Sequence, residues 1–143
     1  MKTLTLAAML ALAPVLALAE GKTHYVAIHV DDSDKRVMNM ALNNAQNVEA
    51  YYKSQGDDVV IEVVAYGPGL QMFVEGGSPV ADRISTMSLA MDNITFSACG
   101  NTHRKMSEKA GKDVVLMSEA VVVPSGVVQL IALQEQGYAY IRP

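Results

Sequence analysis

The sequence predicts an α/β fold in which a mainly parallel sheet of about five strands lies between two layers of helices. Two observations predict this class. Short runs rich in valine and isoleucine alternate with longer segments whose apolar residues recur every three or four positions. Most successive runs are separated by enough residues to hold a helix, and a parallel pair of strands needs such a crossover.

The first part of the chain is expected to form two strands on either side of a long helix. Residues 24–30 and 59–65 are short and almost continuously apolar, as is typical of strands that helices cover on both faces. The helix is predicted over 35–55, where Ser33 or Asp34 is suited to cap its start. Its spacing predicts an inward face made of Val37, Met40, Ala41, Asn44, Ala45, Val48, Tyr51 and Tyr52.

The middle of the chain is predicted to hold a tight loop, two helices and the third strand. Residues 66–69 (Tyr-Gly-Pro-Gly) form the loop, and a short helix is expected over 70–74. Pro79 is suited to the first turn of a helix over 79–91, because its fixed φ matches that position. The third strand covers 94–98. The inward face of the second of these helices is expected to consist of Val80, Ile84, Met87 and Met91.

The last part of the chain is predicted to add two helices and two strands. A short, basic helix covers 102–110, and the segment 114–117 is either extended or a helical turn. A fourth strand covers 120–123, a helix covers 127–136, and a short final strand at 138–141 is expected at an edge of the sheet. The inward face of the last helix is expected to consist of Val127, Leu130, Ile131 and Leu133.

The first nineteen residues have the features of a signal peptide. Lys2 supplies a positive start, residues 4–18 form an apolar run, and Ala17-Leu18-Ala19 is a site of the small-x-small type. The apolar run is shorter than the roughly 20 residues of a membrane span. We therefore expect residues 1–19 to be removed and 20–143 to form one domain in the periplasm or outside the cell, with an uncleaved anchor as the alternative.

Charge and motifs exclude several classes of partner and cofactor. The chain has 11 basic and 15 acidic residues and no basic stripe, which argues against nucleic acid and, after cleavage, against a membrane surface. The glycines of 67–69 lack the spacing of a dinucleotide-binding or P-loop motif. No metal-ligand spacing is visible, so we expect neither a cofactor nor a metal.

The only cysteine, Cys99, is the main candidate functional residue. A single cysteine in an exported chain is free, paired between chains, or reactive. Cys99 follows the third strand and precedes Gly100 and a helix that Asn101 or Thr102 can cap. The unpaired N–H groups and dipole of that helix favour a thiolate there. The alternative is a small, buried, inert side chain.

Parallel topology predicts which residues surround Cys99. The loops that follow parallel strands meet at the carboxyl edge of the sheet, where ligands bind. His103, four residues after Cys99, is expected to be a solvated side chain on a polar helix, with a thiolate–imidazole pair as the alternative. The candidate ligand-binding residues beside catalytic Cys99 are therefore those of the four loops, Asp31, Tyr66, Gly67, Gly100, Asn101, Thr102 and Ser125.

Several segments together resemble the DsrE/DsrF-like family of sulfur-relay proteins. The resemblance implies a flavodoxin-like three-layer fold that assembles into homo- or hetero-oligomers. It also implies that the cysteine in the loop after the third strand, the place of Cys99, holds sulfur as a persulfide. The segments that carry the resemblance are 29–32, 41–45, 63–70, 97–102, 123–127 and 136–141.

The resemblance leads to one functional expectation and leaves two alternatives. We expect a periplasmic sulfur carrier or sulfurtransferase that holds sulfane sulfur on Cys99, exchanges it with donor and acceptor proteins or small thiols, and forms a homo-oligomer. The sulfur-relay members are cytoplasmic, whereas this chain is expected to be exported. The alternatives are a binding module for a small ligand or metal, and an oligomer-forming subunit in which Cys99 is buried.

Overall fold

A computed structural model describes residues 21–143, so the expected leader at 1–19 lies outside the described residues. Helices and strands alternate along the chain as the sequence predicts. In chain order they are β1 (Thr23–Val30), α1 (Lys35–Ser54), β2 (Asp58–Ala65), the 3₁₀ helix η1 (Gly67–Phe73), α2 (Ala81–Ala90), β3 (Ile94–Cys99), α3 (Gly100–Ala110), β4 (Ala120–Val123), α4 (Gly126–Glu135) and β5 (Ala139–Ile141).

The strands form one five-stranded sheet in the order β4-β3-β2-β1-β5, and every pair in it is parallel. This arrangement confirms the predicted parallel sheet of about five strands. The short last strand, β5, pairs with β1 at one edge, as expected. Because all strands run in one direction, the turns after β1, β2, β3 and β4 lie at the same, carboxyl edge of the sheet.

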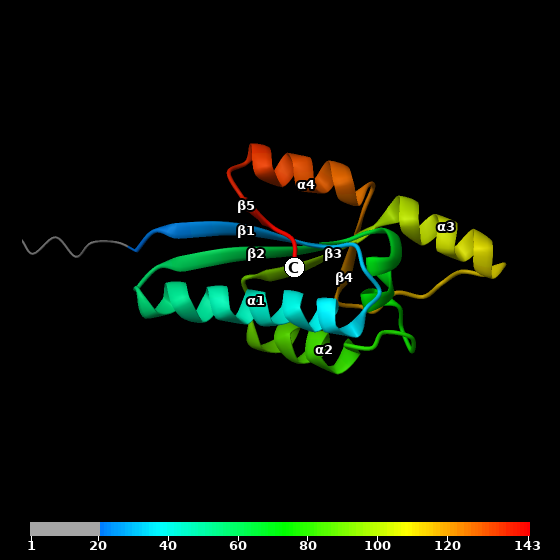
Figure 1. The fold of residues 1–143 in the computed structure, drawn as a ribbon, viewed down its shortest axis with the longest axis horizontal. Coiled ribbons are helices and arrows are strands. Elements are labelled where there is room, and N and C mark those ends of the chain that lie inside the picture. Colours follow the sequence, from blue (N-terminus) through cyan, green and yellow to red (C-terminus); the bar gives the residue numbers. More distant parts are fainter. Residues whose placement is uncertain (1–20) are drawn as a thin grey trace, which may run out of the picture.

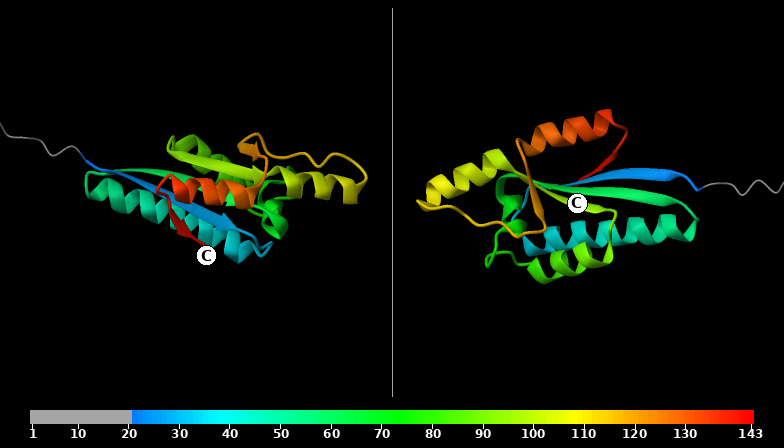
Figure 2. Two further views of the ribbon diagram at one scale, coloured as in Figure 1. Left: turned by 90° about the horizontal axis from the view of Figure 1, so that it is seen from above. Right: turned by 180° about the vertical axis from the view of Figure 1, so that it is seen from behind.

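Helices cover the two faces of the sheet unequally. Figure 1 shows α1 and α2 on one face and α4 alone on the other, so the three-layer flavodoxin-like class is confirmed. The larger core lies between the sheet and the α1–α2 layer, and a small cluster of Ala27, Val64, Leu130 and Leu133 lies under α4. The remaining helix, α3, projects beyond the carboxyl edge, which the two views of Figure 2 make plain.

Two helices present other faces to the core than their spacing suggested. In α1 the buried residues are Met38, Ala41, Leu42 and Ala45, whereas Met40 is 48% exposed and Tyr51 60% exposed. Both stripes recur every three or four residues, so periodicity alone does not decide between them. In α4 only Gly126, Leu130 and Leu133 are buried. The inward positions expected for Val127 and Ile131 are wrong, because both are about half exposed.

Several other local expectations hold, but Pro79 lies before α2 and not in its first turn, because the helix begins at Ala81. Val80, Ile84, Met87 and Met91 are all buried. Asp34 caps α1, and its carboxylate accepts a hydrogen bond from the Arg36 amide at 2.8 Å. The ambiguous segment 114–117 is extended and forms an antiparallel bridge between Leu116 and Val74. Within 21–143, none of the helices has the length and apolar character needed to cross a membrane.

Candidate functional site

Cys99 lies where the sheet ends and a helix begins. It is the last residue of β3 and also the N-cap of α3, with an extended backbone at φ −66° and ψ 114°. The predicted cap at Asn101 or Thr102 is therefore wrong, because α3 begins earlier, at Gly100. A Cβ at Gly100 would lie 3.0 Å from the Val123 carbonyl oxygen, so glycine here allows the start of α3 to pack closely against the end of β4. The side chain of Cys99 is free and only 4% exposed.

Hydrogen-bond donors around the Cys99 sulfur outweigh the effect of its burial on the pKa of the thiol. Burial raises the pKa of this thiol, but the Thr102 hydroxyl and the backbone N–H groups of Gly126, Thr102 and Asn101 lower it, and the net pKa lies below the ordinary value. The side chain makes no capping hydrogen bond of conventional geometry to α3. These donors therefore stabilise the negative charge of the thiolate and so lower the pKa of Cys99, as at other helix N-termini.

The lowered pKa has a defined consequence for stability. Because the thiolate is favoured in the folded state, its contribution to the free energy of unfolding is present above the unfolded pKa of about 8.5. That contribution is lost as the pH falls through the lower pKa of the folded protein. The fold thus binds this proton less tightly than the unfolded chain does.

The N-termini of two helices meet at Cys99. The first helical residues of α3 and α4 are Gly100 and Gly126, and both helices begin directly after a strand at the carboxyl edge. A Cβ at Gly126 would lie 3.1 Å from the Cys99 Cβ and 2.9 Å from the Tyr66 ring. Glycine at this position therefore allows the amide end of α4 to approach the sulfur closely. The positive ends of two helix dipoles favour an anion between them.

The turn after β2 closes the site on its other side. The Gly67 amide donates a hydrogen bond to the Thr102 hydroxyl at 3.0 Å, which links this turn to the first turn of α3. Gly67 has a positive φ of 54°, a conformation that a residue with a side chain resists. Tyr66 packs against Gly126, beside Cys99. The structure therefore brings together Cys99, Thr102, Gly67 and Tyr66, as the topology predicts.

Asp31 belongs to a neighbouring cluster at the same edge. Its carboxylate accepts hydrogen bonds from the Arg142 guanidinium at 3.1 and 2.9 Å. His29, 4% exposed, stacks on Tyr66 with ring centroids 4.5 Å apart, and its Nδ1 lies 2.7 Å from the Tyr140 hydroxyl. Burial lowers the pKa of His29, the Asp31 carboxylate opposes this and Arg142 reinforces it, so the pKa lies below its ordinary value. Tyr66 thus separates Cys99 from a buried histidine.

The remaining predicted site residues lie beside the sulfur but direct their side chains elsewhere. The Asn101 side chain accepts a hydrogen bond from Arg104, so only its backbone faces Cys99. Ser125 is the N-cap of α4 and makes no side-chain capping bond. His103 is half-buried and contacts the Val114 carbonyl oxygen through Nε2 at 2.6 Å, so it is neither solvated as expected nor directed at the sulfur.

Sequence reasoning missed Gly126, His29, Tyr140 and Arg142. Gly126 follows the predicted site residue Ser125 at the start of a helix, and a glycine there indicates that another part of the chain packs closely against it. The other three depend on the pairing of β5 with β1, which no local pattern specifies. Within the described part of the chain, no three histidine, cysteine or carboxylate side chains come together as candidate metal ligands.

Comparison with known proteins agrees with this architecture. A family model described as the DsrE/DsrF-like family matches residues 26–143, which is most of the chain and includes every strand of the sheet in whole or in large part. The chain belongs to the DsrE/DsrF-like family. A search of curated proteins finds no match.

Among solved structures, this DsrE/DsrF-like chain is similar to a protein of unknown function, MTH1491 from Methanobacterium thermoautotrophicum. The sequence identity is 32% and the TM-score is 0.68, and the match covers 84% of this chain and 99% of that protein. Family membership indicates a sulfur-relay-like role that involves partner proteins.

The close contact at Gly126 generates a stability prediction. Gly126→Ala places a methyl group against Tyr66 and Cys99, and overpacking of this kind costs about 1–3 kcal/mol. The better helix propensity of alanine offsets at most about 1 kcal/mol, so urea denaturation is expected to show net destabilisation. The matched control, Ser125→Ala, removes no capping bond and is expected to change stability by less than about 0.5 kcal/mol. Equal effects of the two substitutions would contradict this packing.

Proposed function

We propose that this chain carries sulfane sulfur as a persulfide on Cys99, in the periplasm. The observation that carries the proposal is the placement of the only cysteine, in a member of a sulfur-relay family, between the N-termini of two helices that lower its pKa. A thiolate is the nucleophile in sulfur exchange, so a thiol whose pKa is lowered is better suited to accept sulfur than an ordinary thiol. The periplasmic location rests on the leader expected at residues 1–19.

The proposed transfer needs no oxidant. The Cys99 thiolate attacks the outer sulfur of a donor persulfide, R–S–SH. A bond forms between Sγ and that sulfur, the donor S–S bond breaks, and the electron pair leaves with the donor thiolate. The transferred sulfur keeps its proton as Cys99–S–SH. An acceptor thiolate then attacks the same outer sulfur, which regenerates the Cys99 thiolate.

Burial restricts how sulfur reaches Cys99. With 4% of the residue exposed, an incoming donor must displace either Tyr66 or the first turn of α4. The Cys99 side chain makes no capping hydrogen bond to α3. The Ser125 side chain likewise makes none to the start of α4. We therefore propose that exchange occurs in an open state of the Pro124–Gly126 turn. The N–H donors around the sulfur stabilise both the thiolate and the persulfide anion.

Intact-mass measurement tests the sulfur-carrier proposal. After incubation with cysteine persulfide or thiosulfate and removal of the small molecules, the wild-type chain is expected to gain the mass of one sulfur atom. The gain should disappear with dithiothreitol and should be absent in Cys99→Ser, which retains the site's shape. A wild-type chain that never gains this mass, or a Cys99→Ser chain that does, contradicts the proposal.

The burial of Cys99 also favours a second candidate, an assembly subunit in which the thiol is inert. In either case we propose a homo-oligomer, because α4 presents apolar side chains to solvent and no charged residue precedes Glu135 in it. A helix of this kind is typical of a buried position. Its outward residues are Val127, Val128 and Ile131, each at least half exposed in the isolated chain.

Light scattering after size exclusion tests the assembly. The wild-type chain is expected to have a molar mass above that of a monomer, and Ile131→Glu is expected to reduce it by placing a charge on the outward face of α4. Leu89→Glu on α2, at a residue 91% exposed, is the matched control and is expected to leave the mass unchanged. A monomeric wild type, or equal disruption by both substitutions, contradicts assembly through α4.

A further inference from the structure

The helix that begins at Cys99 contributes no fully buried residue to the core, and only Met106 packs against it. α3 spans Gly100–Ala110, and none of its residues is buried. Its half-buried residues include one stripe, Thr102, His103, Met106 and Ser107, and the opposite stripe faces solvent. Figure 1 shows that α3 extends past the sheet instead of covering a face of it. A helix placed in this way, directly after the proposed reactive residue, is available for contact with another molecule.

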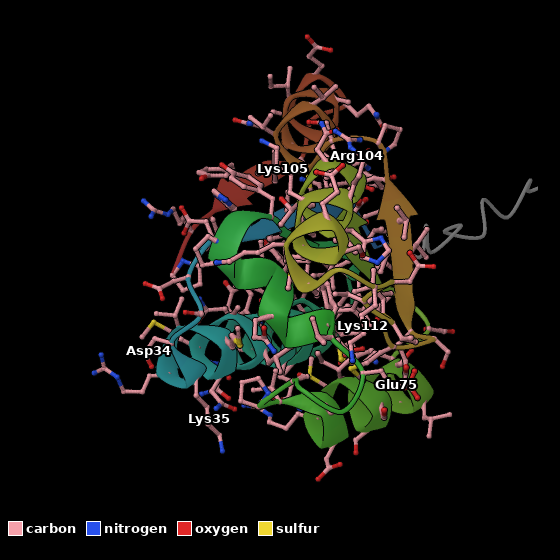
Figure 3. The ribbon with its side chains drawn as sticks, turned by 90° about the vertical axis from the view of Figure 1, so that its right-hand side faces the viewer. Asp34, Lys35, Glu75, Arg104, Lys105 and Lys112 are labelled. Carbon is pink, nitrogen blue, oxygen red and sulfur yellow. The ribbon has the colours of Figure 1, made fainter. Side chains whose placement is uncertain are left out.

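The positive charge of an acidic protein is concentrated on this helix and the turn after it. Residues 100–112 contain four basic residues and one acidic residue, whereas the rest of the described chain contains six basic and thirteen acidic residues. Arg104, Lys105, Lys109 and Lys112 are all exposed. Figure 3 views the molecule from this end and shows Arg104 and Lys105 beside α3 and Lys112 beyond its far end.

A groove joins two of these lysines, Lys105 and Lys109, to the surroundings of Cys99. It has a volume of about 530 Å³ and lies between η1 and α3, with Lys105 and Lys109 at its rim and Met106 and Pro68 among its apolar residues. Gly67 and Thr102 also line it, and the hydrogen bond between them closes one side of the cysteine site. A partner seated in the groove therefore touches the same two residues that lie beside the sulfur.

The charges of the groove are not neutralised within the protein. Among residues 21–143, no carboxylate lies within ion-pair distance of Lys105, Lys109 or Lys112, and Arg104 has only a 3.9 Å contact with Glu108. The acidic turn at 31–34, of which Ser33 lines the groove, is neutralised except at Asp32, which accepts a hydrogen bond from the Asp34 amide and has no ion pair among residues 21–143. Asp34 pairs with Arg36, and Asp31 pairs with Arg142. The groove thus presents net positive charge to an incoming molecule.

We propose that α3 and the adjoining groove dock an acidic protein partner whose reactive thiol is surrounded by aspartate and glutamate side chains. The proposal rests on the sulfur-carrier function above and specifies the chemistry of the donor or acceptor. Within α3 the cations from Arg104 to Lys109 span about 7.5 Å at about 1.5 Å per residue, and Lys112 follows in the next turn, a spread that suits several carboxylates better than one small inorganic anion. Complementary charge of this kind orients a partner and raises its association rate.

Peptide binding tests the docking surface without sulfur chemistry. The probe is a fluorescent synthetic peptide with a central serine flanked by aspartate and glutamate, compared with an asparagine–glutamine peptide of the same length, and the protein carries Cys99→Ser. Anisotropy is expected to show binding of the acidic peptide only, weakening as salt screens the charges. Lys105→Glu with Lys109→Glu is expected to weaken this binding about tenfold or more.

A charge-matched control removes the effect of net charge. Lys22→Glu with Lys53→Glu makes the same change at the opposite end of the sheet and is expected to leave binding unchanged. Absence of binding, equal binding of the neutral peptide, or equal loss in both double variants overturns the proposal. Displacement of the peptide by thiosulfate at constant ionic strength identifies a small-anion site and also overturns it. A changed molar mass of the Lys105→Glu, Lys109→Glu chain identifies a second copy as the occupant and overturns it too.

Failure of docking and failure of the sulfur-carrier function are distinguishable. Loading of Cys99 by cysteine persulfide, a small donor that needs no docking, is measured in parallel on chains that retain Cys99. Normal loading together with peptide binding that ignores Lys105 and Lys109 refutes docking alone. Lysine-dependent peptide binding without any loading refutes the sulfur-carrier function and leaves α3 as an acidic-protein surface.

Discussion

The interaction on which the site depends is that of one sulfur atom with the N-termini of two helices. β3 and β4 are neighbouring parallel strands, so the helices that follow them begin side by side at the carboxyl edge. Cys99 ends the first strand, and Gly126 begins the helix after the second. Their contact is possible only because Gly126 has no side chain between Tyr66 and Cys99. Desolvation alone raises the pKa of the thiol, and the Thr102 hydroxyl together with the N–H donors of the two helices more than offsets it.

This arrangement also explains how a nearly buried cysteine can be reactive. Its immediate neighbours are N–H groups and a hydroxyl, which stabilise the anion while they exclude bulk water. The groups that cover it, Tyr66 and the first turn of α4, are held by packing and not by a capping side chain. The open state proposed above displaces only these groups and leaves the β-sheet in place. Reactivity and burial are therefore compatible at this position.

The sequence was sufficient for the class of fold and for the position of the cysteine, because both follow from local pattern. Alternating runs specify parallel strands, and parallel strands gather their following turns at one edge. The faces of α1 and α4 were not predictable in the same way. Met38 and Met40 both lie on plausible stripes, and only packing against the sheet decides that Met38 is buried. The contact of Arg142 with Asp31 depends on β5 joining β1 across the whole chain, which spacing cannot reveal.

The central claim is that folding favours the thiolate of Cys99, because the pKa of this thiol lies below its ordinary value. The most direct measurement is the rate of alkylation of Cys99 by iodoacetamide as a function of pH, for the native protein and for the same protein in guanidinium chloride. We predict that the native rate reaches its plateau at a pH below about 8.5, the value of an unperturbed thiol that the unfolded chain should show. A native rate that rises through the same pH range as the unfolded chain, or alkylation only on unfolding, would contradict it.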